Sequence, residues 1–276
     1  MSNTACANRL TNHRVKRHMK AQRAGAMIAA LSLGLATALS HAAANAQESQ
    51  IMSHTQTAAP SASETLTARQ QAIVPIAAFA AAGDMTKLSA ALSQGLDAGL
   101  TVSDAKEILV QLYAYAGFPR SLNALGELMK VLEARKQRGI QDAPGALPSR
   151  AIPKGDALLA AGTANQTELV GSPVKGPLFD FAPAIDEYLK THLFGDIFER
   201  DNLDWQSREL ATVGMLSALP GAESQLQSHL RISMNVGLTV GQLRQLTEVL
   251  ADRVDTENAR RARAALDRNL ITSGVK

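Results

Sequence analysis

The tetrapeptide Gly-Leu-Thr-Val occurs twice in this chain, at 99–102 and at 237–240, so the two occurrences lie 138 positions apart. The same offset aligns Gly83 with Gly221, Leu88 with Leu226, Leu92 with Leu230 and Leu112 with Leu250. A shared period of this length is typical of a duplicated supersecondary unit, which restricts the fold to two similar sets of elements that pack together. Residues needed for packing should recur in both copies, whereas residues needed for chemistry can survive in only one.

The first 46 residues predict a secretory signal peptide. Basic residues without any acidic residue precede an apolar stretch at 24–39, and the small residues Ala44 and Ala46 follow where a signal peptidase reads the chain. The apolar stretch is shorter than the about 20 residues that span a bilayer. We therefore expect cleavage after Ala46, a periplasmic or secreted protein, and no membrane contact after cleavage. Residues 47–65 are polar and aperiodic, and they predict a disordered lead-in.

Removal of this leader changes the predicted net charge. The whole chain carries 28 Lys and Arg against 25 Asp and Glu, and six of the basic residues lie in the leader, which leaves 22 against 25 and a net charge of −3. An acidic chain does not favour nucleic-acid binding. The single cysteine, Cys6, also lies in the leader, so we expect no disulfide and no thiolate nucleophile. The remaining histidines, at positions 54, 192 and 229, are too scattered for a zinc site. We expect neither a metal nor a cofactor.

Capping and breaking residues predict an all-α fold without strands, because no segment shows the strand period of two. Thr67 and Gln70 form a capping box that opens a helix to about Ala82. Further helices are predicted over 84–98, 101–116, 119–138, 182–200, 204–219, 222–236, 239–253 and 255–270. The expected organisation is two related multi-helix units, 66–138 and 181–270, joined by a linker at 139–180 that is rich in proline and glycine.

Residues 112–124 (Leu-Tyr-Ala-Tyr-Ala-Gly-Phe-Pro-Arg-Ser-Leu-Asn-Ala) and 204–212 (Asp-Trp-Gln-Ser-Arg-Glu-Leu-Ala-Thr), followed by His229 and by Asn-Val-Gly-Leu-Thr at 235–239, resemble the carboxymuconolactone decarboxylase family. The resemblance covers nearly all of residues 66–270. It implies the all-helical fold that this family shares with alkylhydroperoxidase D-like proteins. It also implies assembly of several small helical units, so the expected partner is the protein itself, in a homo-oligomer and most simply a trimer.

The resemblance also bears on the reaction. The peroxidase branch of this superfamily has a Cys-x-x-Cys pair one turn before the helix histidine, and here Ala222 and Gln225 occupy those two positions. The decarboxylase branch keeps the glutamate and the histidine without the cysteines. The resemblance therefore favours a decarboxylase-like protein and argues against a thiol peroxidase of the alkylhydroperoxidase type.

Glu209 and His229 are the predicted catalytic residues. Glu209 lies on an apolar helical line, where a carboxylate needs a partner, although a glutamate in a first turn can also stabilise the helix dipole. A lone histidine such as His229 can equally be a half-buried core residue. At the corresponding positions of the first copy stand Gln71 and Ala91, so packing does not require either ionisable group.

Three arginines, Arg120, Arg208 and Arg231, are candidates for a bidentate contact with a substrate carboxylate, with a solvated helix surface as the alternative. Tyr113 and Tyr115 point to different helix faces, so at most one of them lines a pocket. The favoured hypothesis is an exported, cofactor-free lyase acting on a small lactone or keto acid. The alternative is a non-enzymatic periplasmic helical assembly that binds a small acid or a protein partner.

The signal peptide generates a first prediction. Mass spectrometry of protein from the periplasmic fraction of an expressing bacterium should find an N-terminus at Gln47. A cytoplasmic species that retains Met1 would contradict both the export prediction and the net charge of the mature chain.

Overall fold

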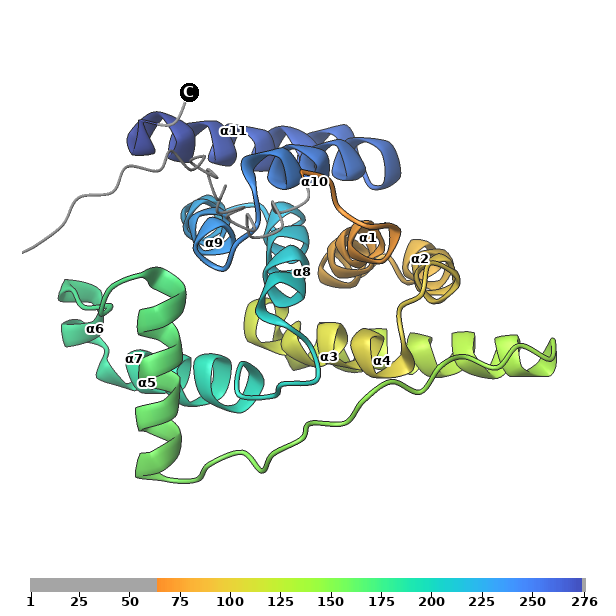
Figure 1. Cartoon of the computed structure of the whole chain (residues 1–276), viewed down its shortest axis with the longest axis horizontal. Coiled ribbons are helices and arrows are strands. Elements are labelled where there is room, and N and C mark those ends of the chain that lie inside the picture. The colour runs from red at the N-terminus through yellow and green to blue at the C-terminus, as the bar shows by residue number, and fades with distance from the viewer. Residues whose placement is uncertain (1–63, 275–276) are drawn as a thin grey trace, which may run out of the picture. The chain divides into compact units, whose positions relative to one another are not determined.

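A computed structural model describes residues 64–274, and these residues form helices without any strand (Figure 1). The predicted signal peptide and positions 47–63 of the predicted lead-in lie outside the described residues. Glu64 and Leu66 are described and contact the later part of the chain, since the Leu66 amide donates to Gln245 Oε1 at 2.6 Å. No helix in the described part is both long enough and apolar enough to cross a membrane.

The helix bounds follow the sequence offset closely. The first four helices are α1 (Ala68–Ala82), α2 (Met85–Asp97), α3 (Val102–Gln111) and α4 (Tyr113–Gln137). The last four are α8 (Trp205–Ser217), α9 (Glu223–Asn235), α10 (Val240–Arg253) and α11 (Thr256–Ser273). Both ends of α2 and α9, and the first residues of α3 and α10, are 138 positions apart. A residue 138 positions away is called the counterpart below. The division of the chain into two units stays a prediction.

The predicted capping box of Thr67 and Gln70 is confirmed, and two further helices begin with the same motif. Thr67, Thr101 and Thr239 each form a capping box at the start of a helix. Gly83, which closes α1, has a φ of 76°, a left-handed conformation that glycine adopts without a side-chain clash. Local sequence therefore determines where these helices begin and end.

Helix α1 packs along α8 at the centre of the described region (Figure 1). Every residue of α1 from Ala72 to Ala81 is buried, as expected for a helix that is apolar on all sides. Gly214 in α8 permits this close approach, because a Cβ atom there would lie 2.8 Å from the backbone oxygen of Val74. A larger residue at position 214 would force the two helices apart.

Helix α4 bends sharply at Gly117, where φ is 79° and ψ is 163°. The helix therefore breaks at Gly-Phe-Pro, as the sequence predicts, and Pro119 opens the longer second part. The short first part carries Tyr113 and Tyr115. The break fixes the direction in which these two side chains leave the backbone.

Part of the predicted linker at 139–180 is helical. Helix α5 (Asp156–Val170) lies inside it, and α6 (Pro177–Phe181) follows. The prolines and most glycines lie on either side of α5, so they do not prevent the helix from forming. Gly162, inside α5, meets the backbone of a π-helix, η1 (Leu189–Ile197), because a Cβ there would lie 1.7 Å from the Lys190 carbonyl oxygen. Helix α7 (Pro183–Tyr188) and η1 together form the helical region predicted at 182–200.

The contact at Gly214 predicts opposite effects for two glycine-to-alanine changes. Gly214→Ala should lower the free energy of unfolding by about 1–3 kcal/mol, because the new methyl group meets the α1 backbone. The matched control is Gly126→Ala in α4, where a Cβ atom would meet no atom within 4 Å. That change should raise the free energy of unfolding by about 0.5–1 kcal/mol, since alanine is the better helix former. Urea denaturation measures both, and equal effects would contradict the packing described.

Candidate active site

Glu209 and His229 form a buried pair across two neighbouring helices. Glu209 belongs to α8 and His229 to α9, and His229 Nδ1 lies 2.9 Å from Glu209 Oε2. Glu209 is 0% exposed and His229 is 7% exposed. The other carboxylate oxygen, Glu209 Oε1, is buried and has no hydrogen-bond partner among the described residues. An unsatisfied buried acceptor is costly, and such groups often mark functional sites.

Tyr115 approaches the same histidine from α4. Its hydroxyl oxygen lies 3.4 Å from His229 Nε2 and 3.4 Å from Thr212 Oγ1. Burial raises the pKa of the Tyr115 phenol, and the negative charge of Glu209 raises it further. The phenol therefore stays protonated at neutral pH and can donate a hydrogen bond. Tyr113 stacks on Phe118 instead, with ring centroids 4.6 Å apart.

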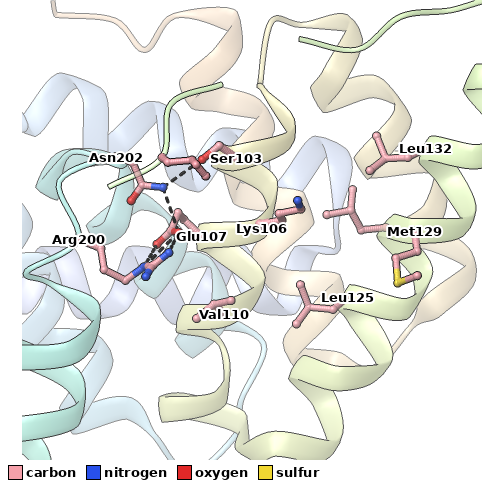
Figure 2. Close-up of a pocket in the computed structure, with 11 residues that line it drawn as sticks. Ser103, Lys106, Glu107, Val110, Leu125, Met129, Leu132, Arg200 and Asn202 are labelled. Carbon is pink, nitrogen blue, oxygen red and sulfur yellow. Dashed lines mark hydrogen bonds and ion pairs between the residues drawn. The ribbon is translucent and has the colours of Figure 1, made fainter. Parts of the chain in front are cut away.

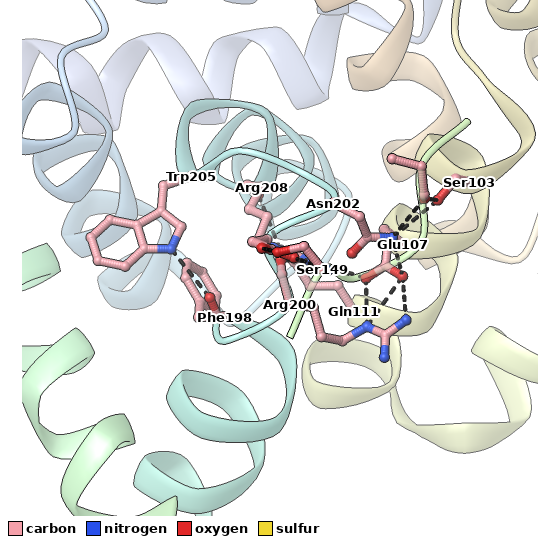
Figure 3. A network of polar contacts seen from close by, with 11 residues as sticks. Ser103, Glu107, Gln111, Ser149, Phe198, Arg200, Asn202, Trp205 and Arg208 are labelled. Atoms are coloured by element: carbon pink, nitrogen blue, oxygen red, sulfur yellow. Dashed lines mark hydrogen bonds and ion pairs between the residues drawn. The ribbon is translucent and has the colours of Figure 1, made fainter. Parts of the chain in front are cut away.

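A second buried cluster lies beside this pair and centres on Glu107 in α3 (Figure 3). Arg200 binds both carboxylate oxygens of Glu107, with donor–acceptor distances of 2.6–3.1 Å. Arg208 Nη2 lies 3.0 Å from Glu107 Oε2 and also donates to the Arg200 carbonyl oxygen. Glu107 is thus a buried carboxylate held between two guanidinium groups.

Gln111 connects the Glu107 cluster with the Glu209–His229 pair. Its side-chain nitrogen donates to Thr212 Oγ1 at 2.7 Å and to the Arg208 carbonyl oxygen at 3.0 Å. Arg208 Nη1 donates to Gln111 Oε1 at 3.3 Å. Because Thr212 also contacts Tyr115, polar contacts run without interruption from Glu107 to His229. Such a network fixes its members' orientations when each is satisfied.

The pKa of Glu107 reflects this environment. Burial by itself would raise it, but hydrogen bonds from Arg200, Asn202 and Arg208 outweigh the burial, and the net pKa is lowered. Burial lowers the pKa of the Arg208 guanidinium, against the opposing effect of Glu107. Glu107 is therefore ionised at neutral pH and balances charge inside the protein.

The three predicted substrate-binding arginines do not converge on His229. Arg208 is fully buried and bound to Glu107, so a substrate carboxylate there would have to displace that residue. Arg120 is exposed and its guanidinium donates to the carbonyl oxygen at the end of α1. Arg231 is exposed, and residues two positions apart on a helix do not face each other, so it points away from His229. Their contact with substrate stays a prediction that these positions do not support.

The structure brings together Glu209 and His229, the two residues that the sequence pairs. The sequence does not predict Tyr115 as their neighbour, and it gives no indication of Glu107 and Gln111. The tyrosines carried a signal, since the motif around them supports the family resemblance. Glu107 and Gln111 share one face of α3, four positions apart, but nothing in the sequence indicates what that face meets. Within residues 64–274 no group of three or more His, Cys, Asp or Glu side chains is arranged to hold a metal ion.

Comparison with known proteins places the pair inside a recognised domain. Residues 183–268 match the model of the carboxymuconolactone decarboxylase family. Over 69 residues the chain is 33% identical to a 4-carboxymuconolactone decarboxylase of Acinetobacter baylyi. The aligned stretch covers 25% of this chain and 51% of that relative. The chain thus spans about half the length of the curated relative it matches. It contains a carboxymuconolactone decarboxylase family domain that includes Glu209 and His229.

The Glu107 cluster predicts how stability depends on pH. Because the folded-state pKa of Glu107 is lowered, its stabilisation is present above the unfolded pKa and is lost as the pH falls through the folded value. Glu107→Gln should cost about 3–5 kcal/mol at pH 7, because it leaves buried arginine charge unbalanced. The cost should shrink as acid protonates the wild-type carboxylate.

Thermal or urea unfolding between pH 7 and pH 3 measures this dependence. The control is Glu257→Gln, whose exposed carboxylate pairs with Arg260 at the surface and should change stability little at any pH. An unchanged acid dependence in the Glu107 variant would show that this carboxylate does not balance the buried charge.

Proposed function

We propose that this protein is a carboxymuconolactone decarboxylase-like enzyme that needs no cofactor and acts on a small lactone acid or keto acid. The observation that carries the proposal is the buried Glu209–His229 pair inside the matched domain. Thiol peroxidase chemistry of the alkylhydroperoxidase type is not part of the proposal, because residues 64–274 contain no cysteine.

The counterpart positions support a chemical rather than a structural role for the pair. Gln71 and Ala91 stand where Glu209 and His229 stand 138 positions later, and Arg253 is the counterpart of Tyr115. Arg253 donates to Gln71 Oε1 at 3.1 Å, so the counterpart positions are also polar. They lack both the glutamate and the histidine, although the surrounding helices pack in the same order. Packing therefore does not require an ionisable pair at these positions.

The proposed reaction breaks the bond between the leaving carboxylate and the neighbouring carbon. Carbon dioxide departs, the electron pair of that bond moves into a conjugated carbonyl group, and the resulting enolate then takes a proton at carbon. The enzyme must therefore supply one proton at a defined position, which is general acid catalysis.

His229 is the proposed proton donor. Its Nδ1 is held by Glu209, which fixes the orientation of the ring, so Nε2 is the nitrogen available for proton delivery. Tyr115, neutral and 3.4 Å from Nε2, is the proposed neighbour that orients the imidazole or the substrate oxygen. A contact of this length can tighten when substrate binds.

The proposals for localisation and assembly are based on the sequence alone. The predicted signal peptide supports export to the periplasm or the medium, and the family resemblance supports a homo-oligomer, most simply a trimer. One observation favours the alternative of a non-enzymatic assembly that binds a small acid or a protein: His229 is only 7% exposed, so substrate access requires local opening.

Substitution of the pair tests the proposal. The purified protein is screened with lactone acids and β-keto acids while carbon dioxide release is measured. His229→Ala and Glu209→Gln should each lower turnover about a hundredfold or more, the usual scale for loss of a general acid or its partner. Both variants should stay folded with an unchanged oligomeric state, since alanine and glutamine occupy the counterpart positions.

His192→Ala serves as the control, because His192 is exposed on η1 and pairs with Asp196 at the surface. It should retain wild-type turnover. Unfolding or dissociation of either site variant would assign the pair a structural role, and the binding assembly would then be the better function.

A further inference from the structure

One side of α4 exposes a line of apolar side chains. They recur at spacings of three and four residues, at Leu122, Leu125, Met129 and Leu132, and are called the α4 face below. Leu122 is exposed, and Met129 is 72% exposed. The other two half-bury their side chains, and with Met129 they line a cavity of about 290 Å³ between α3 and α4 (Figure 2). This spacing is typical of a helix that packs against another helix.

Packing inside the chain does not require most of the α4 face. At three of its four positions the counterpart helix α11 has an exposed charged residue, namely Arg260, Arg263 and Asp267. The fourth position, Leu132, recurs as the buried Leu270. The apolar side chains at the first three positions therefore have no role inside the chain that explains them.

A second set of exposed apolar side chains lies on α6 and α7. It consists of Leu178, Phe181, Ile185 and Tyr188, and is called the α6–α7 face below. Phe181 is 88% exposed, more than any other large apolar side chain in residues 64–274. A soluble monomer rarely leaves so many large apolar side chains uncovered in one short segment, so this set marks a contact surface.

The α6–α7 face lies in an acidic segment. Residues 177–188 contain three acidic residues and no basic one. Asp186 pairs with Lys190 of η1, whereas Asp180 and Glu187 form no ion pair with any described residue. Because Asp180 directly precedes Phe181, the most exposed apolar ring stands next to an unbalanced negative charge.

The α4 face has basic residues beside it. Lys106 stands on α3, across the cavity from the apolar side chains of α4 (Figure 2). Lys136 follows one helical turn after Leu132, and neither lysine pairs with an acid in the part of the chain that the structure describes. Glu133 is the one acid of α4 without an ion pair to a described residue, since Glu127 pairs with Lys130. Two unpaired bases against one unpaired acid make this surface positive, opposite to the α6–α7 face.

These properties select a second copy of the chain as the partner. Two α4 faces would bring positive charge against positive charge, and two α6–α7 faces would bring negative against negative, whereas one face of each kind brings opposite charges together. A contact between two different faces is heterologous, and it closes into a ring when it is repeated around an axis. The trimer put forward above requires such a contact, because a face that contacts its own copy makes a dimer.

We propose that the α6–α7 face of one copy docks on the α4 face of the next copy. Phe181 enters the cavity between α3 and α4, which has room for a phenyl ring, and Asp180 pairs with Lys106. The inference rests on the proposed homo-oligomer and names the two surfaces that form it. It does not depend on the proposed decarboxylation.

Sedimentation velocity of the purified protein tests each face. Met129→Asp and Phe181→Asp should each raise the dissociation constant of the oligomer at least about tenfold, because a charge replaces an apolar contact. Met129→Asp should stay folded, since Asp267 is the counterpart of Met129. The matched control is Ile271→Asp on α11, which also replaces a highly exposed apolar side chain but lies on neither face. The control should leave the oligomer mass unchanged.

Two further measurements test which face meets which. A mixture of Met129→Asp and Phe181→Asp should form a dimer, because the intact α6–α7 face of the first variant meets the intact α4 face of the second. Lys106→Glu and Asp180→Lys should each weaken assembly about tenfold, because like charges then face each other. The double variant should restore assembly, since the two charges are exchanged.

The outcomes separate this inference from the homo-oligomer itself. An oligomer mass that neither Met129→Asp nor Phe181→Asp changes would overturn the proposed surfaces and leave the homo-oligomer in place. Dissociation by Met129→Asp alone would assign the α4 face to a two-fold contact between copies, and a mixture that does not associate would exclude the head-to-tail contact. A monomeric wild-type protein at about 100 μM would overturn the homo-oligomer as well. Circular dichroism establishes that each variant is folded.

Discussion

The buried charge of Glu107 is the constraint on which the neighbouring structure depends. A carboxylate with 2% of its surface exposed is stable in a protein only when cations and hydrogen-bond donors surround it. Arg200 and Arg208 supply this compensation from the turn before α8 and from α8 itself, so α3 and α8 can pack only in one register. The same register brings Gln111 against Thr212 and thereby places Tyr115 beside His229. Charge balance in one cluster thus fixes the geometry of the next.

Comparison of counterpart positions separates packing from chemistry. Leucines at Leu88, Leu92 and Leu112 recur 138 positions later and are buried in both places, which is what a core requires. Glu209 and His229 do not recur. We place the proposed catalytic role at this pair for that reason.

Most helices could be predicted because their signals are local. The capping boxes at Thr67, Thr101 and Thr239 depend on residues three positions apart, and glycines close the helices with conformations that other residues avoid. Helix α5 could not be predicted, because the prolines and glycines that flank residues 156–170 indicate only a connecting segment. Helix α5 is stabilised there by burial against η1, a contact between distant segments that no local pattern reports.

The sequence by itself determined the helical class, the helix ends, and the choice of Glu209 and His229, because periodicity, caps and the failure of a residue to recur are all readable along one chain. Only the tertiary structure decided what these residues meet. Tyr115 lies 114 positions from His229, and Arg208 lies 101 positions from Glu107. Arg208 could be read as a substrate contact until the fold placed a buried carboxylate beside it. Partners so far apart depend on how helices pack, and packing is a property of the whole core.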